Sequence, residues 1–229
     1  MADYKVVDAE QLDSDLGTIA NAIREQTGKR DDIPFPNGFA SAPAELVEVG
    51  KKSEYDRQWD ALQENGSDSI DYRYKFFYWP NDAYRPKYTI RSTKANMSYV
   101  FQNSKIEDTL VDVDCSAATT CGYMFGYCSR MHTIRKLIVS EKNVFGLYGF
   151  QSCLALVNLT VEGKFGNSID LQWSTLLSKD SITSVVNALS TTVSGQSVTF
   201  SQTAVDKAFN AEEWNALAST KPNWTFAFV

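Results

Sequence analysis

Three six-residue blocks decide the fold: YVFQNS at 99–104, YMFGYC at 123–128 and YGFQSC at 148–153. They align on a Tyr-x-Phe core, and the steps between their phenylalanines, Phe101, Phe125 and Phe150, are 24 and 25 residues long. An apolar pattern that ends in a short strand follows the second and the third block. A period of about 20–29 residues with one strand per turn is typical of a leucine-rich-repeat solenoid. Such a coil cannot bury its apolar face alone, so we expect the coils to stack into a common core.

Two cysteines, Cys128 and Cys153, keep the same period of 25 residues. Catalytic thiols would not recur with each coil, so the repeat favours a column of small buried side chains that Ser104 completes. The tyrosine and phenylalanine rings of the blocks are expected to point inward beside them. The four cysteines of the chain show no Cys-x-x-Cys spacing and no histidine cluster, so we interpret them as reduced thiols rather than zinc ligands.

Composition excludes several classes of protein. The chain has 229 residues, of which 43% are hydrophobic and 22% charged, so wholesale disorder is excluded. Its formal net charge of −6 argues against a general binder of nucleic acid or of anionic membranes. No apolar run reaches the ~18 residues of a membrane span, and we expect no secretory signal at the start.

The N-terminal part is expected to be helical. A helix is predicted over 9–27, with Asp8 as its cap and Gly28 as its stop, and a shorter one over 54–63. The first helix carries a narrow apolar stripe made of Leu12, Leu16, Ile19 and Ile23. This stripe needs a partner surface, which is either the rest of the chain or the same helix of a neighbouring subunit. It is therefore the candidate site for docking or oligomerisation.

Aromatic and basic side chains alternate after this part. The alternation over 72–76 predicts a strand with one aromatic and one basic face, and the basic stretch continues beyond residue 85. Aromatic rings beside cations can stack on sugars or bases, although the rings can equally be core and the cations a solvated face. The candidate receptor-binding residues are Tyr72, Arg73, Tyr74, Trp79, Tyr84 and Arg85.

The sequence predicts no catalytic residue, no cofactor site and no metal site. His132, which is the only histidine, is expected in a loop without a local carboxylate or cysteine beside it. Asp112 and Asp114 alternate with valines as in a half-buried strand. Without a third oxygen ligand nearby, they are interpreted as a solvated strand face and not as a cation site.

The C-terminal part has the pattern of a β-α-β type cap. Ser178 is predicted to begin a helix, Asn210 and Glu213 to form the capping box of another, and strands are predicted at 197–200 and 224–228. The expected fold is therefore mixed α/β in three parts. These are an N-terminal helical attachment or oligomerisation region (1–66), an aromatic-rich strand region with a short irregular leucine-rich-repeat solenoid (67–175), and the C-terminal α/β cap (176–229).

The sequence resembles the leucine-rich-repeat tail and baseplate proteins of phages and prophages of Gram-positive bacteria, whose coils are similar to bacterial surface-antigen repeats. Three stretches carry the resemblance. Residues 11–39 resemble the helix and the Phe-Pro-Asn-Gly-Phe corner that open many such proteins, residues 123–163 resemble their coils, and residues 176–228 resemble their closing segment.

The resemblance implies a non-enzymatic virion component that is made in the bacterial cytoplasm and contributes to attachment at the host surface. Other tail or baseplate proteins are its expected partners, through the N-terminal region, and a host-surface glycan or protein is a further one. It is expected to be a homo-oligomer without nucleic acid or a membrane span. Two alternatives remain, a bacterial cell-surface adhesin with the same coils and a depolymerase that acts on envelope polysaccharide.

Overall fold

The structure is a computed structural model that describes residues 70–79, 88–109 and 111–229. The chain divides into two compact units, Met1–Arg57 and Gln58–Val229, and every described residue belongs to the second. The N-terminal helices predicted over 9–27 and 54–63, with the apolar stripe of the first, lie outside the described residues. The described unit is mixed α/β, with two parallel sheets and three helices.

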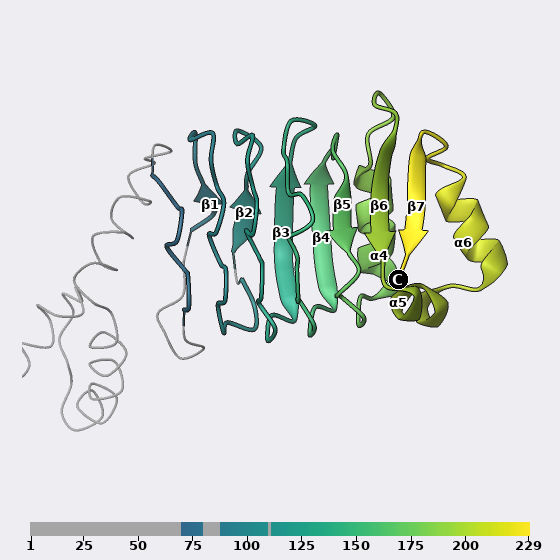
Figure 1. Ribbon diagram of the computed structural model, residues 1–229, viewed down its shortest axis with the longest axis horizontal. Helices are drawn as coiled ribbons and strands as arrows, with labels where there is room; N and C mark the ends of the chain where they lie inside the picture. The colour runs from purple at the N-terminus through teal and green to yellow at the C-terminus, as the bar shows by residue number, and fades with distance from the viewer. Residues whose placement is uncertain (1–69, 80–87, 110) are drawn as a thin grey trace, which may run out of the picture. The chain divides into compact units, whose positions relative to one another are not determined.

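Four strands form the first sheet, in the order in which they occur along the chain (Figure 1). They are β1 (Ile90–Arg91), β2 (Asp112–Asp114), β3 (Thr133–Val139) and β4 (Asn158–Gly163), and every pair is parallel. The register joins Val113 to Leu137 and Ile134 to Leu159. Parallel neighbours cannot be linked by a tight hairpin, so the chain must travel back between strands. The six-residue blocks lie on that return path.

A column of stacked phenylalanine rings fills the space enclosed by these segments. The ring centroids of Phe76 and Phe101 lie 5.0 Å apart, and those of Phe101 and Phe125, and of Phe125 and Phe150, each lie 5.4 Å apart. All four side chains are buried. The stack shows that equivalent residues of successive repeats lie directly upon one another.

The structure adds a fourth block at 74–79, which precedes the three identified from the sequence. Phe76 lies 25 residues before Phe101 and stacks on it. The strand predicted over 72–76 is wrong, because this segment is a series of turns like the other blocks. A Tyr-x-Phe spacing fits both the alternation of a strand and two consecutive turns, so the local pattern could not separate them.

A second parallel ladder connects the blocks to the C-terminal sheet. Isolated bridges join Asn96 to Thr120, Thr120 to Val144, and Gly146 to Ile169. Ile169 begins β5 (Ile169–Leu171), which pairs with β6 (Gln196–Phe200), and β6 pairs with β7 (Trp224–Phe228). The sheet β5-β6-β7 therefore crosses the boundary predicted at residue 176.

Helix α4 (Lys179–Ala188) takes the place of a further strand beside β4 (Figure 1). Its Ser181 hydroxyl accepts from the Leu159 N–H at 2.8 Å and donates to the Val157 carbonyl at 2.9 Å. The Ser184 hydroxyl accepts from the Val161 N–H at 2.8 Å. These serines satisfy edge groups of β4 that another strand would otherwise bind. The first sheet thus ends on the side chains of a helix.

The local signals of the C-terminal part are confirmed. Ser178 caps α4, and Asn210 and Glu213 form the capping box of α6 (Ala211–Ala218). The strands β6 and β7 match the two predicted there. Helix α5 (Gln202–Ala208) was not predicted, and its N-cap residue, Ser201, makes no capping hydrogen bond with its side chain. Among the described residues, no helix is both long and apolar enough to cross a membrane.

Candidate binding surface

Of the six residues predicted to bind a receptor, the structure describes four, and these four do not form one surface. Tyr72 is only 1% exposed and belongs to the core, which corrects the prediction for this residue. Trp79 is half-buried, and its ring packs edge-on against Phe76 at 5.3 Å. Tyr84 and Arg85 lie outside the described residues. Only Arg73 and Tyr74 are exposed.

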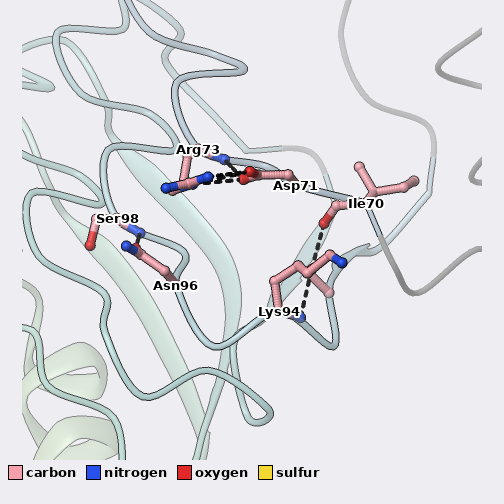
Figure 2. A network of polar contacts seen from close by, with 7 residues as sticks. Ile70, Asp71, Arg73, Lys94, Asn96 and Ser98 are labelled. Carbon is pink, nitrogen blue, oxygen red and sulfur yellow. Dashed lines mark hydrogen bonds and ion pairs between the residues drawn. The ribbon is translucent and has the colours of Figure 1, made fainter.

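Arg73 is held by its neighbour Asp71. Its guanidinium contacts the Asp71 carboxylate at 2.6 Å, and the Asp71 oxygen also accepts from the Arg73 backbone N–H at 3.1 Å (Figure 2). Hydrogen bonding from Arg73 lowers the pKa of Asp71. One repeat later, the Asn96 side chain accepts from the Ser98 N–H at 2.8 Å in the same way. The side chains of Asp71 and Asn96 thus each accept a backbone hydrogen bond just before the blocks at 74–79 and 99–104, and Arg73 contributes to this local structure through its ion pair with Asp71.

Tyr74 is the first member of a column of stacked tyrosines. Its ring lies 4.8 Å from that of Tyr99, Tyr99 lies 5.4 Å from Tyr123, and Tyr123 lies 4.7 Å from Tyr148, with interplanar angles of 7°, 12° and 8°. Tyr74 is 54% exposed and Tyr148 45%. The expectation that the tyrosine rings point inward is therefore wrong, since this column lies at the surface.

A second column runs beside the first, four residues further along each block. It consists of Tyr78, Asn103, Tyr127 and Ser152, all of which have a positive φ, between 52° and 61°. Tyr78 is 62% exposed and Tyr127 42%. We call the two columns together the tyrosine face, which is defined by Tyr74, Tyr99, Tyr123, Tyr148, Tyr78, Asn103, Tyr127 and Ser152.

Backbone hydrogen bonds between blocks hold the face in register. The N–H groups of Tyr99, Phe101 and Asn103 donate to the carbonyls of Gly122, Met124 and Gly126 at 3.0, 2.8 and 2.9 Å. Within a block, the Gly126 N–H donates back to the Tyr123 carbonyl at 3.0 Å, which closes a turn. The rings are therefore spaced by the backbone ladder and not by their own packing alone.

The tyrosine face carries no formal charge at neutral pH, because its eight positions hold only phenol, amide and hydroxyl groups. Desolvation raises the pKa of the Tyr123 phenol, and the phenols of Tyr148, Tyr127 and Tyr99 raise it further. The face can donate and accept hydrogen bonds through these groups and can offer ring edges to apolar atoms. Its eight positions hold no cation that would neutralise a phosphate.

The cysteine column is buried as predicted. The Cys128 thiol donates to the Phe101 carbonyl at 2.9 Å, and the Cys153 thiol donates to the Phe125 carbonyl at 3.0 Å. Burial raises the pKa of Cys128, and it raises the pKa of Cys153 to about 12. Because both thiols stay protonated at neutral pH, they are poor nucleophiles.

The remaining chemical candidates lie apart from one another. His132 is exposed in the loop before β3, as predicted. In β2, Asp112 and Asp114 are half-buried around a buried Val113, and the Asp112 carboxylate lies 3.6 Å from the Lys136 amine. Within the part of the chain that the structure describes, no three histidine, cysteine or acidic side chains are grouped so as to hold a metal ion.

The repeat period in the sequence locates the tyrosine column as well as the phenylalanine core. The four stacked tyrosines each lie two residues before a core phenylalanine, so the period that located the core also located them. What the period does not show is the direction of each ring. Tyr74, Tyr99 and Tyr123 have positive φ values, which the residue type disfavours and the period does not reveal.

No family model matches the chain, and no curated protein or solved structure matches it either.

Proposed function

We propose that this chain is a non-enzymatic attachment protein of a phage or prophage tail or baseplate, built on a leucine-rich-repeat type solenoid. The observation that carries the binding role is the tyrosine face, in which a tyrosine recurs at one position in four successive blocks and the rings of Tyr74 and Tyr148, at the ends, are exposed. Large exposed aromatic groups mark interaction surfaces when they are gathered and held rigidly. The buried phenylalanine column beneath them supplies that rigidity.

The solenoid assignment is supported by the period and by the stacking of equivalent residues. Successive repeats place one strand each in a parallel sheet and stack one phenylalanine each in the core. In a protein of this kind, surface side chains can vary from coil to coil without disturbing the core. The shortness of β1 and β2 makes this a proposal for an irregular member of that architecture.

The tail or baseplate assignment is supported by the sequence resemblance of 11–39, 123–163 and 176–228. In this proposal the N-terminal region docks onto the particle and joins copies of the chain, through the stripe of Leu12, Leu16, Ile19 and Ile23. Several copies on one particle would strengthen a weak contact with the host through their high effective concentration.

Imaging of intact phage particles with a labelled antibody against the chain tests the assignment. We expect label at the tail tip or baseplate, and label on the surface of particle-free bacteria would instead favour a cell-surface adhesin. The purified chain is also expected to bind host cells without releasing sugars. Release of reducing ends from purified host wall would overturn the non-enzymatic part of the proposal and favour a depolymerase.

A further inference from the structure

The second column of the tyrosine face combines a disfavoured backbone conformation with exposed rings. Tyr78 and Tyr127 have φ values of 52° and 61°, in the left-handed region that disfavours residues other than glycine, asparagine and aspartate. Asn103 occupies the same position of the block at 99–104, with a φ of 57°. Since Tyr78 and Tyr127 are also 62% and 42% exposed, burial of their rings does not offset this cost. A disfavoured conformation at exposed aromatic residues favours a role in binding.

The stacked column restricts how a ligand can be held. Each inner ring, Tyr99 and Tyr123, has a neighbouring ring on both of its faces, at 4.7–5.4 Å. The column therefore offers to solvent a row of ring edges and hydroxyl groups. Such a row suits a ligand that carries many hydroxyl groups along its length and can exchange a hydrogen bond at every step.

The chemical groups of the face decide between polymer classes. An extended peptide is held mainly through its backbone N–H and C=O groups at an open sheet edge, whereas the column offers side chains. A nucleic acid needs cations for its phosphates, and the eight positions of the face carry none. An extended cellulose- or chitin-like glycan is neutral and carries hydroxyl groups on every sugar, so it can exchange hydrogen bonds with the phenols along the column.

We propose that the tyrosine face binds an extended, uncharged glycan that runs along the tyrosine column, one sugar for each repeat. This rests on the proposed attachment function and names its ligand class. The hydroxyl groups of Tyr74, Tyr99, Tyr123 and Tyr148 bond to successive sugars, and the rings of Tyr78 and Tyr127 contact their apolar C–H faces.

Calorimetric titration of the full-length chain tests the ligand class. The probes are oligosaccharides of increasing length derived from chitin and from cellulose, with maltose-type oligosaccharides, which coil, as the control. For at least one extended series we expect affinity to rise with length up to about four sugars and then level off, because the column has four rings. Binding of neither extended series would overturn the proposal, as would equal binding of the coiled controls.

Two matched variants separate binding from folding. Tyr127→Asn places at this position the residue that the chain itself uses at Asn103, so the backbone keeps its conformation. It is expected to weaken glycan binding by about tenfold without loss of thermal stability. Tyr123→Phe keeps the stacked ring and removes one hydroxyl group, and it is expected to weaken binding several-fold. Leu176→Ser, at an exposed side chain in the loop before α4, is the control that leaves binding unchanged.

The outcomes distinguish the glycan proposal from the proposed attachment function on which it rests. Unchanged glycan affinity in both tyrosine variants would overturn the proposal for this face. If the antibody locates the chain at the tail and the chain binds host cells but no glycan, the proposed ligand class is wrong while the attachment function stands. If the chain instead doubles its mass in solution and Tyr127→Asn restores the monomer, the face is a contact between copies and the glycan proposal is overturned.

Discussion

The phenylalanine column and the tyrosine column are two residues apart in every block and stack at similar spacings, but they differ in burial. The Phe101–Phe125 step and the Tyr99–Tyr123 step are both 5.4 Å. Phe101 and Phe125 are fully buried, whereas the ends of the tyrosine column are about half exposed. A repeated aromatic contact therefore stabilises the fold most where its rings are buried away from water. The same stacking at the surface leaves ring edges and hydroxyl groups available for binding.

Removal of one ring from each column gives the largest expected difference. Phe125→Ala leaves a cavity between two stacked rings and is expected to lower the free energy of unfolding by about 3–5 kcal/mol. Tyr123→Ala, two residues away, is expected to cost about 1 kcal/mol, since its ring is only half buried. Urea unfolding of both full-length variants measures the difference. Equal losses would show that the tyrosine column is part of the core.

Unfolding at alkaline pH tests the burial of the cysteine column. Cys153 has a pKa of about 12 in the folded chain, against 9.0 for an ordinary thiol. Because the folded pKa is the higher one, the stabilisation is complete below pH 9 and is lost as the pH rises towards 12. Its slope is expected to approach about 1.4 kcal/mol per pH unit. Urea unfolding across this range should give a shallower slope for Cys153→Ala, and identical slopes would contradict the burial of this thiol.

The edge of β4 depends on α4. Ser181→Ala removes the hydroxyl that joins the Leu159 N–H to the Val157 carbonyl and is expected to cost about 1–3 kcal/mol, because the buried Leu159 N–H loses its partner, whereas the Val157 carbonyl keeps the Ser178 N–H. Ser184→Ala, whose partner is the part-buried Val161 N–H, is expected to cost less. Thermal unfolding ranks the two variants, and the reverse order would place the edge contact of β4 elsewhere.

The smallest expected effect on stability lies in the second column of the tyrosine face, which holds Tyr127. Asparagine adopts the left-handed conformation at a lower cost than tyrosine, so Tyr127→Asn is expected to leave the free energy of unfolding unchanged or to raise it by up to about 1 kcal/mol. The opposite exchange, Asn103→Tyr, is the control and is expected to destabilise the chain by a similar amount. Differential scanning calorimetry resolves shifts of this size. A clear loss of stability in Tyr127→Asn would mean that this ring supports the fold.

Local signals in the sequence were sufficient where hydrogen bonds between near neighbours decide the structure. The caps at Ser178 and Asn210 depend on residues three positions away, and both are confirmed. The alternation around Val113 likewise depends only on which face of one strand is buried. Helix α5 escaped prediction because it begins without such a capping bond.

Other features required the stacked neighbours to be known. The sequence signals that placed a boundary at 176 contained no indication that β5 pairs with β6, because that pairing joins segments 29 residues apart. The sequence predicted a strand over 72–76 because a Tyr-x-Phe spacing fits a strand as well as the turns that the structure shows in this segment. The candidate surface of six residues failed at Tyr72 for the same reason, since the direction of its ring follows from turns and not from strand alternation.

The amino-acid sequence by itself determined the period of the repeat, the residues that fill its core, and the caps of the C-terminal helices, because each follows from spacing or from contacts close along the chain. Only the tertiary structure decided that the tyrosines stand in an exposed column and that a helix, rather than a strand, completes the edge of the first sheet. Both depend on contacts between successive repeats, where stacking and hydrogen bonding outweigh the conformational preference of any single residue.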